Sequence, residues 1–173
     1  ETPTVGAEWV PPADEFETLP GVMAAARVGD YRAEISITAD AGGRIRGRFL
    51  AVDRVDFMQV AWFRGDLARE SLGALMNRLA ATDDGILVSE KFLAEHGLSV
   101  GDHLNIHVIT DFGTSLNSAF TVVGAYEYFP TVYDDQVTII GNLEFLFSFF
   151  GMVMPHRLWL KLEPGADGKV AID

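Results

Sequence analysis

The segment 85–130 constrains the fold of this chain most strongly, because its elements and turns can be read almost residue by residue. A short apolar run, Ile-Leu-Val, is typical of a buried strand. Ser89 then predicts a helix N-cap, and Gly97 predicts the end of that helix. Residues 104–108 alternate apolar and polar side chains, and residues 120–125 are apolar on both faces, so each predicts a strand. The segment therefore predicts a strand–helix–strand–strand unit.

The N-terminal part of the chain predicts a β-hairpin followed by two helices. Residues 22–38 predict a long strand, residues 40–43 (Asp-Ala-Gly-Gly) a turn, and residues 44–52 the returning strand. A first helix is predicted to follow a cap at Asp53, and a second over residues 71–81. The first helix would have a broad apolar face made of Val55, Phe57, Met58, Val60, Ala61 and Trp62.

The C-terminal part predicts a strand, a helix and a strand, over residues 137–140, 142–150 and 158–162. Placed in sequence, the elements predict an α+β fold, a two-lobed mixed domain. An outer α+β lobe would combine residues 15–82 and 131–173. A smaller β-rich α+β lobe, residues 83–130, would be inserted in the middle.

Composition limits the class of protein. At 173 residues the chain has the length of one domain, and 49% apolar against 22% charged residues is typical of a globular fold. The absence of cysteine excludes a disulfide framework and a thiolate metal site. A net charge of −12 argues against nucleic acid and anionic lipid as partners. No run approaches the ~20 apolar residues of a membrane span, and the first residues lack signal-peptide features.

No motif in the chain predicts catalysis, a cofactor site or a metal site. His103 and His107 lie in a predicted strand, where four residues at roughly 3.3 Å each separate them by about 13 Å, too far to share one ion. Asp134 and Asp135 lack the spacing of an EF-hand, so a weak calcium site there has little support. The residues around Ser115 lack the glycine pattern of a nucleophile elbow. We therefore expect no enzyme.

Five motifs resemble one permease family. Three are in the central segment: Leu-Val-Ser-Glu at 87–90, Gly-Leu-Ser-Val-Gly-Asp at 97–102 and Phe-Thr-Val-Val-Gly at 120–124. Weaker matches are Leu-Pro-Gly-Val at 19–22 and the closing strand at 158–162 with the Pro-Gly-Ala-Asp after it. In this order they resemble the MacB-like periplasmic core domain, the extracytoplasmic domain of FtsX-like ABC-transporter permeases. None of these motifs is catalytic.

The resemblance implies that residues 1–173 are a single extracytoplasmic domain of a membrane protein, whose flanking membrane helices lie outside this sequence. Its partners would be other domains of the same permease and a separate cytoplasmic ATPase subunit. The family handles lipid, peptide or protein cargo, and the domain itself performs no chemistry. The chain departs from the family pattern in the predicted helix over residues 71–81. The resemblance therefore does not identify the surface that binds cargo.

The predicted helix near the C-terminus offers the candidate contact site. Residues 143–154 read Leu-Glu-Phe-Leu-Phe-Ser-Phe-Phe-Gly-Met-Val-Met, which is apolar nearly all round. One face would carry Leu143, Leu146, Phe147 and Phe150, and another Phe145, Phe149 and Met152. The second set could be buried between the lobes, or could contact a second subunit, a membrane surface or an apolar cargo.

Two other functions remain open for the chain. It could be a stand-alone secreted binding module that shares strand and turn signatures with the permeases. It could also be a hydrolase with an unrecognised pair of carboxylates. Apolar segments of about 20 residues on both sides of this sequence in its parent protein would favour the permease.

Overall fold

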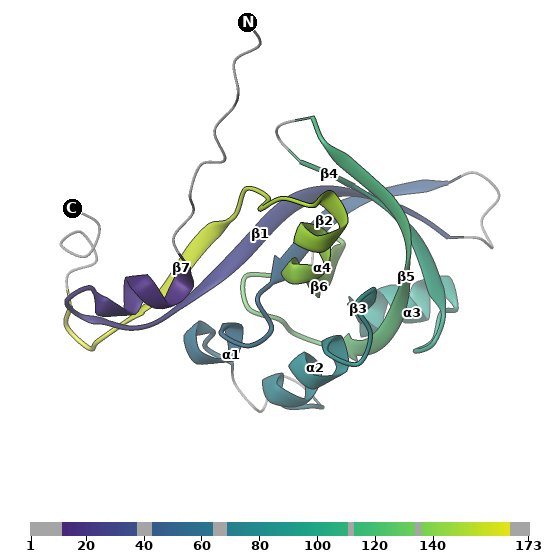
Figure 1. Cartoon of the computed structure of the whole chain (residues 1–173). Coiled ribbons are helices and arrows are strands. Elements are labelled where there is room, and N and C mark those ends of the chain that lie inside the picture. The colour runs from purple at the N-terminus through teal and green to yellow at the C-terminus, as the bar shows by residue number, and fades with distance from the viewer. Residues whose placement is uncertain (1–11, 38–42, 64–68, 111–112, 134–135, 167–173) are drawn as a thin grey trace, which may run out of the picture.

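The computed structural model describes residues 12–37, 43–63, 69–110, 113–133 and 136–166. Strands dominate, with short helices at the periphery of the sheet (Figure 1). In chain order the elements are η1 (Ala13–Thr18), β1 (Val22–Ser36), β2 (Arg44–Val52), α1 (Phe57–Val60), α2 (Leu72–Leu79), β3 (Gly85–Ser89), α3 (Glu90–His96), β4 (His103–Ile109), β5 (Ser115–Tyr126), β6 (Thr138–Asn142), α4 (Leu143–Phe150) and β7 (Arg157–Leu162). The mixed α+β class predicted from the sequence is confirmed.

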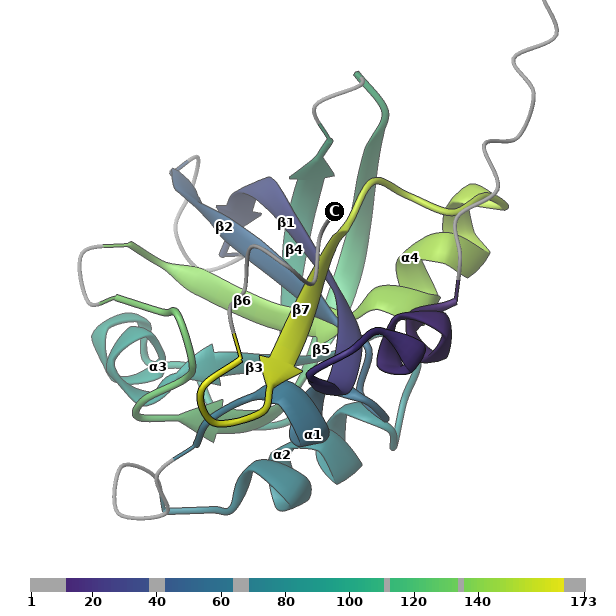
Figure 2. The same cartoon turned by 90° about the vertical axis from the view of Figure 1, so that its left-hand side faces the viewer.

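The strands of the described chain form one sheet that closes on itself. Their order is β2-β6-β3-β5-β4-β1-β7, and β1 also pairs with β2. The six strands β1, β2, β6, β3, β5 and β4 therefore form a ring (Figure 2). The β2–β6 and β3–β5 pairs are parallel and the others are antiparallel. Strand β1 has 15 residues, so it can pair with β7 over its first half and close the ring over its second half.

The first hydrophobic core lies inside this ring. Each of the six strands contributes side chains to it, including Ile35, Phe49, Ile86, Ile106, Phe120 and Ile139. The rings of Phe49 and Phe120 lie 5.3 Å apart between centroids. A β-carbon at Gly141 would overlap the ring of Phe49, so β6 can pass this close only because residue 141 is glycine.

A second core lies on the outer face of the ring, under α1 and α2. Strand residues alternate between the two cores, so that Phe49 belongs to the inner core and Leu50 to the outer one. The helix predicted over residues 71–81 is confirmed as α2, and four of its apolar residues are buried on one face: Leu72, Leu75, Met76 and Leu79. Ser71 caps this helix and accepts a hydrogen bond from the Ala74 N–H at 3.2 Å.

The broad apolar face predicted for the first helix is wrong. Helix α1 has only four residues, because the backbone becomes extended at Ala61. Phe57 is its one fully buried side chain, stacked on Phe129 at 5.5 Å between centroids. Trp62 lies beyond the helix and is 77% exposed. The short helix offers only one turn to the outer core, so Val60 and Ala61 pack against that core only in part. Val55, Met58 and Trp62 are exposed.

The central unit has the predicted elements. Ser89 caps α3 by accepting a hydrogen bond from the Phe92 N–H at 3.2 Å, and Gly97 ends the helix at φ +63°. Gly101 has φ +102° and donates its N–H to the Val122 carbonyl at 2.8 Å, as a turn before β4 requires. Strand β5 is longer than predicted and runs from Ser115 to Tyr126. The predicted turn at 40–43 lies almost wholly outside the described residues.

The division into two lobes is not confirmed and stays a prediction. Strands β3, β4 and β5 come from the segment 83–130, which was expected to form the inserted lobe. They close one ring with β1, β2 and β6, which come from the segments 15–82 and 131–173. The inner core is shared by all six strands.

The first and last strands lie side by side. Val22, the first residue of β1, pairs with Leu162, the last residue of β7. The Glu163 N–H donates to the Gly21 carbonyl at 2.9 Å just beyond this pair. The start of β1 and the end of β7 therefore lie at the same end of the described fold (Figure 1).

Candidate functional site

Helix α4 caps the inner core and carries the candidate contact residues. The Asn142 side chain accepts a hydrogen bond from the Glu144 N–H at 3.0 Å and starts the helix. Leu143 and Leu146 are buried in the inner core. Gly151 follows the helix at φ +64°. The cap and the two leucines thus fix which face of α4 points away from the ring.

The structure divides the three predicted contact residues between core and surface. Phe149 and Met152 are 55% and 58% exposed, and Val153 beside them is 46% exposed. Phe145 is half-buried and meets the buried Phe120 edge-on, at 5.6 Å between centroids. Its other side faces the ring of Phe149 at 6.4 Å. We call Phe149, Met152 and Val153 the α4 tip; Phe145 connects this tip to the core.

Arg27 on β1 holds α4 in place. Its Nη2 donates to Glu144 Oε1 on α4 at 2.7 Å, and its Nε donates to Asp53 Oδ2 at 3.1 Å. Its guanidinium also lies over the ring of Phe147, 5.6 Å from the centroid. Burial lowers the pKa of Arg27, but the hydrogen bonds and charges of the two carboxylates outweigh it, and the pKa is raised. Arg27 thus stays charged and ties β1, the loop before α1, and α4 together.

A second apolar surface was missed by sequence reasoning. A groove of about 420 Å³ is lined by Val60, Ala61, Trp62, Phe63, Tyr128, Phe129, Pro130, Thr131 and Trp159. Trp62 and Tyr128, on its rim, are 77% and 47% exposed. The sequence interpretation placed Trp62 on the buried face of a helix. In the structure α1 ends at Val60, before Trp62, and this residue lies on the surface instead.

The residues considered for chemistry are not brought together. His103 is exposed and His107 is half-buried on β4, and His107 Nδ1 lies 3.7 Å from Glu34 Oε2. Within the described parts of the chain, no three histidine or acidic side chains form a group that could hold a metal. Asp134 and Asp135 lie outside those parts. Among the described helices, none has the length and apolar character needed to cross a membrane.

Comparison with known proteins rests on the fold. No family model matches the sequence, and no curated protein matches it either. A crystal structure of the extracellular domain of the noncanonic ABC-type transporter YknZ from Gram-positive bacteria matches over 88% of this chain, with a TM-score of 0.59 and 10% identity. The fold is that of extracytoplasmic permease domains.

Two further structures agree with this match. The periplasmic region of MacB from Actinobacillus actinomycetemcomitans matches over 92% of this chain, with a TM-score of 0.51 and 8% identity. A domain described as part of a permease from Porphyromonas gingivalis matches over 91%, with a TM-score of 0.50 and 17% identity. The chain covers 72%, 66% and 63% of the YknZ, MacB and Porphyromonas chains, respectively. The resemblance read from the motifs is thus confirmed at the level of the fold.

Proposed function

We propose that this chain is the non-enzymatic extracytoplasmic domain of an ABC-type permease subunit. The observation that carries the proposal is the fold, which the chain shares with extracytoplasmic domains of three such proteins. In this role the domain works with other domains of its own permease and with a separate cytoplasmic ATPase subunit. It binds cargo or a partner protein, or relays movement to them, on the outer side of the cell membrane.

The position of the two ends of the fold supports this role. Val22 and Leu162 are paired neighbours, so β1 begins where β7 ends, with the short helix η1 preceding β1. A domain held by two membrane segments needs this arrangement. The opposite end of the ring, where the β1–β2 and β4–β5 pairs extend, would then point away from the membrane (Figure 1).

The α4 tip is the proposed contact for a partner or cargo. Phe149 and Met152 expose more than half of their surface. Apolar side chains exposed together promote aggregation unless a partner covers them. Phe145 supports Phe149 from the core side, and Arg27 fixes the helix to the sheet. Because its ring is held in this way, Phe149 loses little side-chain entropy on binding. The occupant would be an apolar part of a lipid, a peptide or a protein.

Copurification tests the assignment to a permease. The full-length parent protein is extracted from membranes with mild detergent and purified through an affinity tag. We expect an ATP-binding subunit to copurify and to hydrolyse ATP in the complex. Recovery of the parent protein in the soluble secreted fraction, without an ATPase, would instead support a stand-alone binding module.

A paired set of variants tests the contact. Phe149→Ser with Met152→Ser removes the apolar tip, and Val55→Ser serves as the control because Val55 is equally exposed, at 59%, but lies before α1. The parent protein with the tip variant should still bind the ATPase subunit. It should fail to restore the wild-type phenotype when it is expressed in a strain that lacks the parent gene. The control should restore it. Full restoration by both variants would remove the tip from the proposal.

A further inference from the structure

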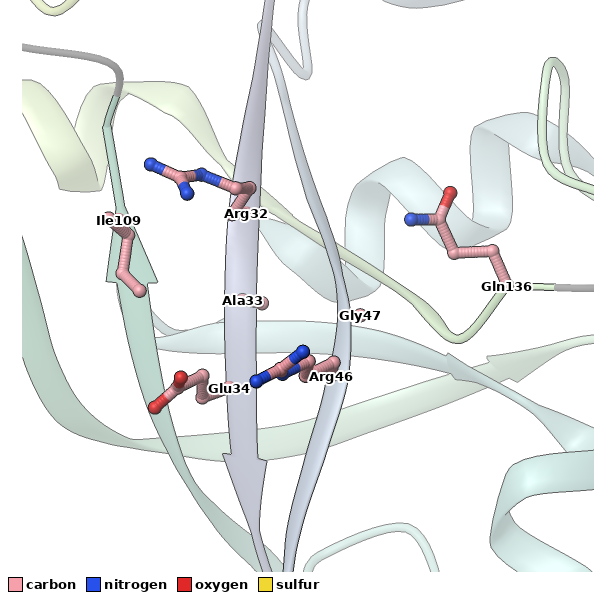
Figure 3. A pocket seen from close by; sticks show the side chains of 7 residues that line it. All are labelled: Arg32, Ala33, Glu34, Arg46, Gly47, Ile109 and Gln136. Carbon is pink, nitrogen blue, oxygen red and sulfur yellow. The ribbon is translucent and has the colours of Figure 1, made fainter.

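The open part of the outer face of the ring carries a hollow rich in arginine. Helix α1 covers this face near Val28 and Leu50, but further along β1 and β2 the face is free. A hollow of about 470 Å³ lies there, within the size range of small-ligand pockets. Its lining residues are Arg32, Ala33, Glu34, Arg46, Gly47, Ile109 and Gln136 (Figure 3).

The two carboxylates of this face are already engaged. Asp30 accepts two hydrogen bonds from Arg48, at 2.6 and 3.0 Å. Glu34 accepts a hydrogen bond from Arg44 at 2.9 Å, although Arg46 is its direct partner across the strands. His107 lies 3.7 Å from the same carboxylate. Neither acid therefore has its charge free to neutralise the remaining arginines.

The guanidinium groups of Arg32 and Arg46 have no hydrogen-bond or ion-pair partner anywhere in the described chain, and both side chains are exposed. Figure 3 shows them on neighbouring strands, with Glu34 beside them and Gln136 on the far side of β2. The chain has 25 acidic residues for 13 basic ones, so two unpaired guanidiniums in one hollow are unusual for its composition. They concentrate positive charge that an anionic ligand would neutralise.

The strand register sets the spacing of these two arginines. Arg32 is paired with Arg48, and Glu34 with Arg46, so Arg32 and Arg46 are diagonal neighbours. Diagonal neighbours on a sheet lie about 7–8 Å apart, and their β-carbons are somewhat closer than that. In an extended peptide, side chains i and i+2 lie on one face, roughly 6.6 Å apart. Two acidic residues at alternate positions of an extended segment therefore match the two guanidiniums.

We propose that this hollow binds an extended acidic segment of a partner protein. Carboxylates at positions i and i+2 of that segment pair with Arg32 and Arg46, each as a charge-assisted hydrogen bond. Ala33 is buried in the inner core, and a β-carbon at Gly47 would point toward Val137 and Ile35, so neither residue places a side chain in the hollow and a peptide backbone can approach the sheet between the arginines. The Gln136 amide is on the rim and can bond to the same backbone.

The charge and position of the hollow select a peptide over a polyanion or a lipid headgroup. A net charge of −12 repels every anion at long range, and it repels nucleic acid or an anionic membrane, which carry many charges, more strongly than a short segment with two carboxylates. Arg32 is ten residues along β1 from Val22, which at roughly 3.3 Å per residue is about 33 Å from the end shared by β1 and β7. In the proposed function that end faces the membrane, so the selection by position rests on the proposed function. The selection by the two unpaired arginines does not depend on the proposed function.

Calorimetric titration of the 173-residue chain with two synthetic peptides tests the proposal. One peptide, blocked Thr-Glu-Val-Glu-Thr, has its glutamates at i and i+2. The other, blocked Thr-Glu-Glu-Val-Thr, has the same composition and charge with the glutamates adjacent. The protein variants are Arg32→Gln with Arg46→Gln, and Arg54→Gln as a control, because Arg54 lies before α1 and outside the hollow. Circular dichroism verifies that each variant is folded.

We expect the alternating peptide to bind at about 20 mM salt and to weaken about tenfold or more at about 200 mM salt. The double variant should bind the alternating peptide about tenfold more weakly than the unsubstituted chain does, and Arg54→Gln should bind it equally well. The unsubstituted chain should bind the adjacent-glutamate peptide less tightly than the alternating one. Equal affinity for both peptides, unchanged binding by the double variant, or full competition by inorganic phosphate would overturn the proposal. Because the titration uses the isolated chain, its failure is distinct from failure of the permease assignment.

Discussion

Replacing Arg27 by methionine should be among the most damaging single changes in this fold. Its carboxylate partner Asp53 has a side chain that is only 7% exposed and lies 2.5 Å from Arg27 Nη2. Methionine keeps much of the arginine stem and removes the charge. Among the described residues, the Asp53 carboxylate then keeps only a long hydrogen bond from the Val55 N–H, at 3.3 Å. A nearly buried carboxylate would be left without its cation.

The expected cost follows from the burial of the two partners. Breaking a buried ion pair by removing one member costs about 3–5 kcal/mol. Arg27 is 22% exposed, so solvent screens part of the pair, and we expect a loss of about 3 kcal/mol in the free energy of unfolding. The second partner, Glu144, is 54% exposed and should contribute less than about 1 kcal/mol.

A second substitution distinguishes charge burial from lost packing. In the Arg27→Met background, Asp53→Asn removes the stranded charge, so the double variant should be more stable than Arg27→Met alone by about 1–2 kcal/mol. Urea unfolding measures all four proteins, with equal slopes required for the comparison. A loss below about 1 kcal/mol for Arg27→Met, or additive losses in the double variant, would refute the reasoning.

Three further predictions concern single positions. Phe149→Ser should lower stability by less than about 1 kcal/mol, and Phe145→Ser by about 2–3 kcal/mol, in urea unfolding, because only Phe145 packs on the inner core; equal losses would contradict this. Burial and the nearby Asp53 raise the pKa of Asp56, partly opposed by Arg27, so ionisation as the pH rises past the ordinary value of 3.8 disfavours the native state. Asp56→Asn should therefore raise the melting temperature at pH 7, with a gain that vanishes below about pH 4; a gain independent of pH would be inconsistent with it. Gly101→Val should cost about 1–3 kcal/mol from its positive φ alone, since a β-carbon there meets nothing within 4 Å; an unchanged denaturant midpoint would contradict the turn.

Local signals explain which parts of the fold could be predicted from sequence. The cap at Ser89 and the helix end at Gly97 depend on neighbouring residues, and both were placed correctly. The closure of the ring depends on pairings between strands far apart in the chain, such as β2 with β6, which periodicity does not encode. The division into two lobes also depends on such long-range pairings, and it stays a prediction.

The candidate surfaces show the same limit. The apolar character of α4 identified the right segment, but only packing separates the half-buried Phe145 from the exposed Phe149. Trp62 was expected on a buried helix face, because a run of apolar residues does not reveal where the helix ends. The hollow depends on the register that makes Arg32 and Arg46 diagonal neighbours, and on which acids pair elsewhere.

Labelling of intact cells tests the central claim most directly. The chain contains no cysteine, so Ala119→Cys introduces a single thiol in it, at an exposed position on β5. The full-length parent protein with this change is expressed, and cells are treated with a membrane-impermeant maleimide before and after lysis, with the unsubstituted parent as control. The reagent must be able to reach the outer face of the membrane in the intact cells. Under that condition the extracytoplasmic assignment predicts that the variant is labelled in intact cells and the unsubstituted parent is not. Labelling that appears only after lysis would place the domain inside the cell and contradict the account.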